Sequence, residues 1–186
     1  MSTPSPGARA VSAFEIDDIF IVSTRADVAH DFNQTDRKQV MLQAMQRFSV
    51  DEKVISQMRV PDGHPEEQFL VVRYFVKAEM YIAKPGSEVL TPEQIQGDRL
   101  ATMEFVFAVD YRCDYKETPS PESLGAFTKN VVLHMWPYWR EAVHAECARM
   151  RIPAITIPML KPGQQLALSL DASSAAPQAE TAKSPD

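Results

Sequence analysis

Two side chains that commonly ligate metal ions, His144 and Cys147, lie three residues apart near the end of a predicted helix. Residues at this spacing share one helix face, so the pair could supply two ligands to a zinc ion. A structural zinc site needs four ligands, usually with a CxxC or HxxxH pair, and the sequence contains neither motif. Further candidates such as His134 and Cys113 are distant in sequence. We therefore expect no metal site and interpret the pair as residues that fill a helix face.

The residue patterns that mark common enzyme classes do not occur in the sequence. It has no nucleophile elbow, no glycine-rich phosphate loop and no dinucleotide-binding fingerprint, and six glycines leave little backbone to cradle phosphates. Acidic pairs such as Asp17-Asp18 and Glu66-Glu67 are typical of solvated strand edges and turns. The sequence therefore predicts a protein that is not an enzyme and uses no cofactor.

Composition narrows the classes of partner. The formal net charge of −6 argues against binding to nucleic acid or to an anionic membrane. Because no run of about 18 apolar residues occurs, we expect no membrane insertion. The N-terminus lacks the features of a secretory signal, and two cysteines are too few for a disulfide framework. These features predict a cytoplasmic protein with reduced thiols.

The nine methionines are a more suggestive feature. Their flexible, polarizable side chains occur on surfaces that bind many different partners. For most of them, ordinary core packing is nevertheless the better interpretation.

Both ends of the chain are poor in residues that can form a core. Residues 1–12 are rich in Ser, Pro, Gly and Ala, and residues 171–186 contain no large apolar side chain. Such segments cannot offset the entropy cost of ordering. We predict a disordered tail over 1–12, one folded domain over 13–162 and a mostly disordered tail over 163–186.

Apolar residues recur at every second position in two long segments, 69–83 and 99–113. This alternation is typical of strands with one buried face. Weaker strand patterns cover 14–24 and 39–50. Because the connections are short and turn-like, the segments are predicted to pair antiparallel.

The other face of segment 69–83 is unusually apolar for a solvated surface. Between charged residues it carries Phe69, Val71, Phe75 and Tyr81. Either a second layer, from this chain or from another subunit, covers this face, or the face is a contact surface.

A helical pattern follows the strands. Ser120, Pro121 and Glu122 supply an N-cap, a proline at the first position and an acid in the first turn. Apolar residues then recur at steps of three and four until Pro153, which predicts a helix over 121–151. Pro137 should bend this helix. A helix of this length exceeds what one small sheet needs, so we expect it to cross into another layer.

The segment NVVLHMWPYWREAVHAECARMRIPAITIPML (130–160) resembles the signature of the SecB family of export chaperones. The family has an Asn a few residues before a Pro-Tyr-x-Arg-Glu core, then a helix that ends in an apolar-Pro-x-apolar-x-apolar segment. The matching residues here are Asn130, Pro137, Tyr138, Arg140, Glu141, Ile152, Pro153, Ile155, Ile157 and Pro158. The resemblance covers about 14–160, so the predicted domain over 13–162 is expected to be a SecB-like chaperone domain.

The resemblance implies an α+β fold, in which a four-stranded antiparallel sheet is followed by a long, proline-kinked helix. It also implies a homotetramer, a dimer of dimers with the long helices sandwiched between sheets. The bent helix and its aromatic residues would then lie between subunits. The residues expected in this interface are Val131, Met135, Tyr138, Val143 and Cys147.

The function implied by the resemblance is ATP-independent holding of unfolded or precursor polypeptides in apolar grooves, so that they stay unaggregated and competent for export. Residues proposed to bind these clients are Phe69, Val71, Phe75, Tyr81, Trp136 and Trp139. Packing in a subunit interface is an equal alternative for each of them. Another possibility is a chaperone dedicated to one client, such as the antitoxin of a toxin–antitoxin system. A third, of a different class, is a non-catalytic oligomeric scaffold.

The family's contact with the export motor ATPase, SecA, uses acidic residues on the sheet surface. Asp27 and Glu104 match two of these positions, whereas Ser23 stands where an acid is expected. The second helix of the family, which contributes to that contact, has no clear counterpart after Pro158. Docking to the motor is therefore an open expectation for this chain.

Overall fold

A computed structural model describes residues 14–29, 43–59, 69–83, 99–113, 119–160 and 168–169. The predicted tail over 1–12 lies outside the described residues. So does the predicted tail over 163–186, except for Leu168–Ser169, which form a short strand and not the disordered segment expected there.

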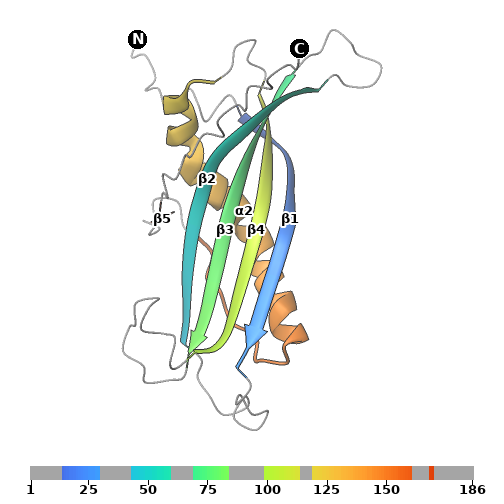
Figure 1. The fold of residues 1–186 in the computed structure, drawn as a ribbon, viewed down its shortest axis with the longest axis vertical. Coiled ribbons are helices and arrows are strands. Elements are labelled where there is room, and N and C mark those ends of the chain that lie inside the picture. The colour runs from blue at the N-terminus through green and yellow to red at the C-terminus, as the bar shows by residue number, and fades with distance from the viewer. Residues whose placement is uncertain are drawn as a thin grey trace, which may run out of the picture.

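Four long strands form the body of the sheet (Figure 1). They are β1 (Phe14–Val28), β2 (Gln43–Arg59), β3 (Phe69–Ala83) and β4 (Arg99–Cys113). The sheet order is β1-β4-β3-β2-β5, with antiparallel pairing among the four long strands. The last strand, β5 (Leu168–Ser169), adds to β2 in parallel. The prediction of an antiparallel sheet is confirmed, although β1 and β2 extend beyond the segments expected from the sequence.

The register between β3 and β4 explains the alternation seen in the sequence. Val72 lies opposite Tyr111, and Tyr74 lies opposite Val109, so the apolar rows of both strands share one face. Because side chains alternate strictly along a strand, the intervening residues form the opposite face.

The helix α2 (Pro121–Arg149) crosses one face of this sheet (Figure 1). It begins as predicted, because Ser120 caps it by accepting a hydrogen bond from the backbone N–H of Ser123 at 3.2 Å. Pro137 lies inside the helix and is exposed, and the residues on both sides of it are helical.

The helix ends through backbone hydrogen bonds before the predicted stop at Pro153 is reached. Arg151 adopts a positive φ of 54°, and its N–H bonds to the carbonyl of Ala148 at 3.2 Å. The N–H of Ile152 bonds to the carbonyl of Cys147 at 3.0 Å. These two bonds and the left-handed residue form a Schellman motif, which satisfies carbonyls at the helix end and reverses the chain.

After this reversal, residues 152–160 return along the helix. The indole N–H of Trp136 donates to the carbonyl of Pro158 at 3.0 Å, which joins positions 22 apart in sequence. Ile152 and Ile157 are buried in the same core. The apolar spacing of this segment therefore serves to seal the end of the core.

The core lies between α2 and the sheet. Trp139 is fully buried, and its ring lies 4.8 Å from that of Phe48 on β2 and 5.0 Å from that of Trp136. We expected the helix and its tryptophans to reach another layer, whereas both indoles pack against the chain's own sheet. The reason is that the strands, at 15 to 17 residues, are long enough to match the helix.

Candidate binding surfaces

The face of the sheet that points away from α2 is called the outer face below. On β3 it carries Phe69, Phe75 and Tyr81, which are partly exposed, and Val71, which is 2% exposed. The structure thus brings four of the predicted client-binding residues onto one face of one strand.

A buried ion pair lies in the middle of the outer face. Arg73 on β3 donates from Nε and Nη2 to the two carboxylate oxygens of Asp110 on β4, at 2.6 and 2.7 Å. Asp110 is 1% exposed and Arg73 is 27% exposed. The hydrogen bond to Asp110 raises the pKa of Arg73, and nearby Asp18 acts in the same direction. Sequence analysis missed this pair, because its members are 37 residues apart and meet only through strand register.

Guanidinium groups lie over two of the aromatic rings on this face. The Arg73 carbon Cζ lies 5.2 Å from the ring centre of Phe20, and that of Arg112 lies 4.2 Å from the ring centre of Phe69. Such cation–π contacts keep a cation beside an apolar ring while both remain at the surface. This half of the outer face is therefore amphipathic, with aromatic and cationic groups side by side.

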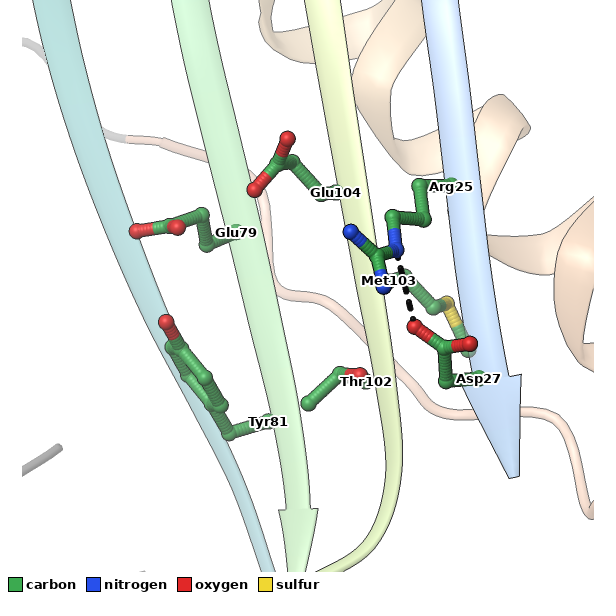
Figure 2. A pocket seen from close by; sticks show the side chains of 7 residues that line it. All are labelled: Arg25, Asp27, Glu79, Tyr81, Thr102, Met103 and Glu104. Atoms are coloured by element: carbon green, nitrogen blue, oxygen red, sulfur yellow. Dashed lines mark hydrogen bonds and ion pairs between the residues drawn. The ribbon is translucent and has the colours of Figure 1, made fainter. Parts of the chain in front are cut away.

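The other half of the outer face contains a polar pocket of about 230 Å³ (Figure 2). Its lining residues come from β1, β3 and β4. They are Arg25, Asp27, Glu79, Tyr81, Thr102, Met103 and Glu104. Both residues that match the family's motor contact, Asp27 and Glu104, line this pocket, and register places Arg25 beside Glu104.

The acids in and around this pocket already have cationic partners. Arg25 Nε lies 3.1 Å from Asp27 Oδ2, and both side chains are exposed. Figure 2 marks this ion pair with a dashed line. Lys77 Nζ lies 2.8 Å from a carboxylate oxygen of Glu104 and 2.9 Å from one of Glu79. The hydrogen bond to Glu104, followed by that to Glu79, raises the pKa of Lys77. Burial is the main cause of the raised pKa of the Tyr81 hydroxyl.

A second surface, here called the β1–α2 groove, lies between β1 and the C-terminal half of the helix. It is a half-open groove of about 320 Å³ with mostly apolar walls. The lining residues are Ile19, Phe20, Ile21, Phe107, Tyr138, Glu141, Ala142 and Ala145. Exposed apolar side chains lie in and beside it, with Ile21 at 45%, Val22 at 52% and Tyr138 at 47% exposure.

Sequence analysis did not identify this groove. Its signal was the run Phe20-Ile21-Val22, which places apolar side chains on both faces of a strand. Register shifts between Ile16 and Asp18 and between Ile21 and Ser23 change the face to which successive residues belong. Alternation alone therefore could not assign these residues to a face.

The remaining predicted site residues lie inside the chain's own core. Trp136 is 2% exposed and Trp139 is fully buried on the face opposite the outer face. Four of the five residues expected between subunits are also fully buried, namely Val131, Met135, Val143 and Cys147. The fifth, Tyr138, is exposed in the β1–α2 groove. Packing within one chain thus already accounts for six of these positions.

The histidine and cysteine weighed as metal ligands do not face the same environment. His144 is exposed, whereas Cys147 is buried, and burial raises the pKa of its thiol. Among the described residues, no group of three or more His, Cys, Asp or Glu side chains could hold a metal ion. Within the same residues, α2 is not apolar enough over its length to cross a membrane.

No protein-family model matches the chain, and no curated protein matches it. Among solved structures, the fold is similar to that of the SecB-like chaperone Rv1957 from Mycobacterium tuberculosis, determined in complex with a ChAD peptide from the Rv1956 HigA1 antitoxin. The TM-score is 0.58 at 21% sequence identity, over 87% of this chain and 100% of that chain. The chain therefore has a SecB-like fold, which confirms the resemblance seen in the sequence at the level of the fold.

Proposed function

We propose that this protein is a SecB-like, ATP-independent chaperone of the cytoplasm that binds unfolded or precursor polypeptides. The observation that carries the proposal is the outer face, where aromatic side chains remain partly exposed after the chain has buried its own core. The SecB-like fold supports it, because the similar protein was solved with a bound peptide. No catalytic step is part of the proposal.

The client surface proposed here centres on Phe69, Phe75 and Tyr81. Burying apolar area against these rings would contribute about 25 cal/mol per Å² to binding, whatever the order of residues in the client. The guanidinium groups of Arg73, over the ring of Phe20, and of Arg112, over the ring of Phe69, would donate hydrogen bonds to carbonyl or carboxylate oxygens of the client. Since Trp136 and Trp139 are buried, we leave them out of this surface.

Assembly into dimers that pair as a tetramer is a second part of the proposal. The β1–α2 groove and the adjacent edge of β1 expose Ile16, Ile21, Val22 and Tyr138, which a second copy would cover. An open edge strand with exposed apolar residues favours pairing with another chain. In this arrangement the groove supports assembly while the outer face stays free for clients.

One pair of variants separates the two surfaces. Phe75→Asp should abolish suppression of the light scattering of heat-unfolded citrate synthase, while the molecular mass in sedimentation stays that of the assembly. Tyr138→Asp should lower the molecular mass and retain binding of the unfolded client. Urea unfolding of both variants checks that each is folded.

The outcomes discriminate among functions. Loss of mass in Phe75→Asp would assign the outer face to subunit packing. If the wild-type protein assembles but never suppresses scattering, the chaperone proposal fails and the scaffold alternative stands.

A chaperone dedicated to one client is a second candidate function, and the antitoxin peptide bound by the similar protein favours it. The two candidate functions differ in the number of different unfolded proteins that the chaperone binds. A general holdase should suppress aggregation of several unrelated unfolded proteins at similar concentrations. A dedicated chaperone should fail with all of them and bind one antitoxin with an affinity at least tenfold higher.

Docking to the export motor SecA through Asp27 and Glu104 also remains a proposal. Arg25 and Lys77 already neutralise these acids, so a basic partner would have to displace both cations. Binding of the isolated tail of SecA tests the contact. Asp27→Asn/Glu104→Gln should abolish the binding, and Lys77→Met should strengthen it, whereas equal affinities in all three proteins would contradict it.

A further inference from the structure

The edge of β2 that does not pair with β3 is partly covered by a short strand of the same chain, β5. β5 pairs with β2 in parallel, with Phe48 opposite Leu168 and Ser49 opposite Ser169. β2 has 17 residues and β5 has two, so among the described residues most of the outer edge of β2 has no paired strand. Exposed edge strands present rows of backbone N–H and C=O groups that can pair with another extended chain.

The part of β2 that pairs with β5 is also packed firmly against the core. Phe48 and Val50 are each 2% exposed, and the ring of Phe48 contacts those of Trp136 and Trp139 at 5.4 and 4.8 Å. This packing holds the backbone of residues 48–50 in place. An added strand would therefore find its hydrogen-bonding partners already positioned, which lowers the entropy cost of binding.

A buried donor lies on the ring that packs against Phe48. The indole N–H of Trp139 is buried, and no described residue accepts a hydrogen bond from it. The ring that carries it packs edge-on against Phe48. Buried polar groups are usually satisfied, and no described residue satisfies this one, but it lies between α2 and the sheet and not at the edge itself.

We propose that the outer edge of β2 at Phe48 and Ser49 is a strand-addition site for extended, non-native polypeptide, and that Leu168–Ser169 occupies it in the absence of a client. This inference rests on the proposed chaperone function and specifies a mode of binding for it. Backbone pairing does not depend on client sequence, which suits a protein that recognises unfolded chains by their exposure. The outer face would supply side-chain contacts, and the edge would supply hydrogen bonds.

Competition between the tail and the client follows from this arrangement. The apparent affinity of a client is reduced by the fraction of molecules in which the edge is free. A two-residue parallel pair makes few hydrogen bonds, so the tail should weaken client binding by only about three- to tenfold. The tail would then reject weakly binding segments and yield to long extended ones.

The test uses the full-length chain with Leu168→Pro and Ser169→Pro together, because proline cannot donate to a strand partner. Ser173→Pro, five residues after Leu168, is the matched control. The probe is fluorescein-labelled, reduced and carboxymethylated α-lactalbumin, an unfolded protein. We expect the double variant to bind it about three- to tenfold more tightly than the wild type and the control do. Equal dissociation constants for all three proteins would overturn the inference and leave the chaperone function intact.

Hydrogen exchange locates the contact independently. Backbone amides of residues 46–50 should exchange faster in the double variant than in the wild type, and saturating client should slow them again. Client binding that leaves these amides unchanged would overturn the proposed site. If none of the three proteins binds the probe, the chaperone function itself fails, together with the inference built on it.

Discussion

The face of the sheet that packs against α2, here called the covered face, and the outer face share the central strands β3 and β4. The side chains of the two faces nevertheless differ in burial and chemistry. On β3 the covered row includes Tyr74, Val76 and Met80, each no more than 1% exposed, and it packs against α2. The outer row alternates with it and includes Phe75 and Lys77, which stay partly exposed. One face therefore supplies most of the burial that stabilises the chain, and the other is free to carry exposed aromatic rings and charges.

Polar groups follow the same division. On the covered face the Tyr74 hydroxyl donates to the carbonyl of Leu124 at 3.2 Å, and the Tyr111 hydroxyl lies 2.9 Å from Nδ1 of His134. On the outer face, carboxylates and cations pair with one another, both across strands and along β3. The face packed against α2 thus satisfies its polar groups by hydrogen bonds between neutral groups, whereas the outer face uses ion pairs, of which Arg73–Asp110 is largely buried and Lys77–Glu104 is exposed.

The largest expected effect comes from the covered face. Trp139→Ala removes a fully buried ring between α2 and β2, and we expect the free energy of unfolding to fall by about 3–5 kcal/mol. Urea denaturation followed by circular dichroism measures this change. His144→Ala, at an exposed position of the same helix, should change it by less than about 0.5 kcal/mol. An equal fall in the free energy of unfolding for both variants would show that burial against the sheet does not set the stability.

The next effect concerns the buried ion pair of the outer face. Arg73→Met leaves the carboxylate of Asp110, which is 1% exposed, without its guanidinium partner. We therefore expect the free energy of unfolding to fall by about 3 kcal/mol. Replacing both residues, Arg73→Met with Asp110→Leu, should recover most of this loss in the same urea experiment. A double variant as unstable as Arg73→Met alone would show that the pair is not the cause.

The pH dependence of stability should reflect the covered face. Burial lowers the pKa of His134 below its ordinary value of 6.5, so the folded state binds fewer protons than the unfolded state. The contribution of this histidine to the free energy of unfolding is then complete above about pH 6.5. It falls as the pH decreases toward the lower pKa of the folded state, by at most about 1.4 kcal/mol per pH unit. His134→Gln should flatten this slope between pH 7 and 5.5, measured by urea unfolding. A slope unchanged by the substitution would assign it to other groups.

The smallest expected effect comes from the exposed ion pairs of the outer face. Lys77 and Glu104 are 42% and 41% exposed, so Lys77→Met should cost less than about 1 kcal/mol in the urea experiment. Salt at 1 M should reduce the difference further, because it screens exposed charges. A loss as large as that of Arg73→Met would show that this half of the face is structural.

Much of the fold could be predicted from local patterns. The alternation in 69–83 and 99–113, the N-cap at Ser120 and the helical spacing after it correspond to β3, β4 and α2. The site was predicted less completely. Four aromatic or aliphatic residues of β3 were correctly placed on one face, but the β1–α2 groove and the Arg73–Asp110 pair depend on β1 register and cross-strand contacts that no local pattern encodes.

By itself, the sequence determined which residues share a face, because a period of two or of 3.6 residues follows from backbone geometry alone. It also determined where the helix begins. Only the tertiary structure decided what covers each face: Trp136 and Trp139 could pack on the chain's own sheet or on another copy, and the position of Phe48 on β2 settled this. The physical reason is that periodicity specifies an apolar surface but not its partner, which depends on the packing of segments far apart in the chain.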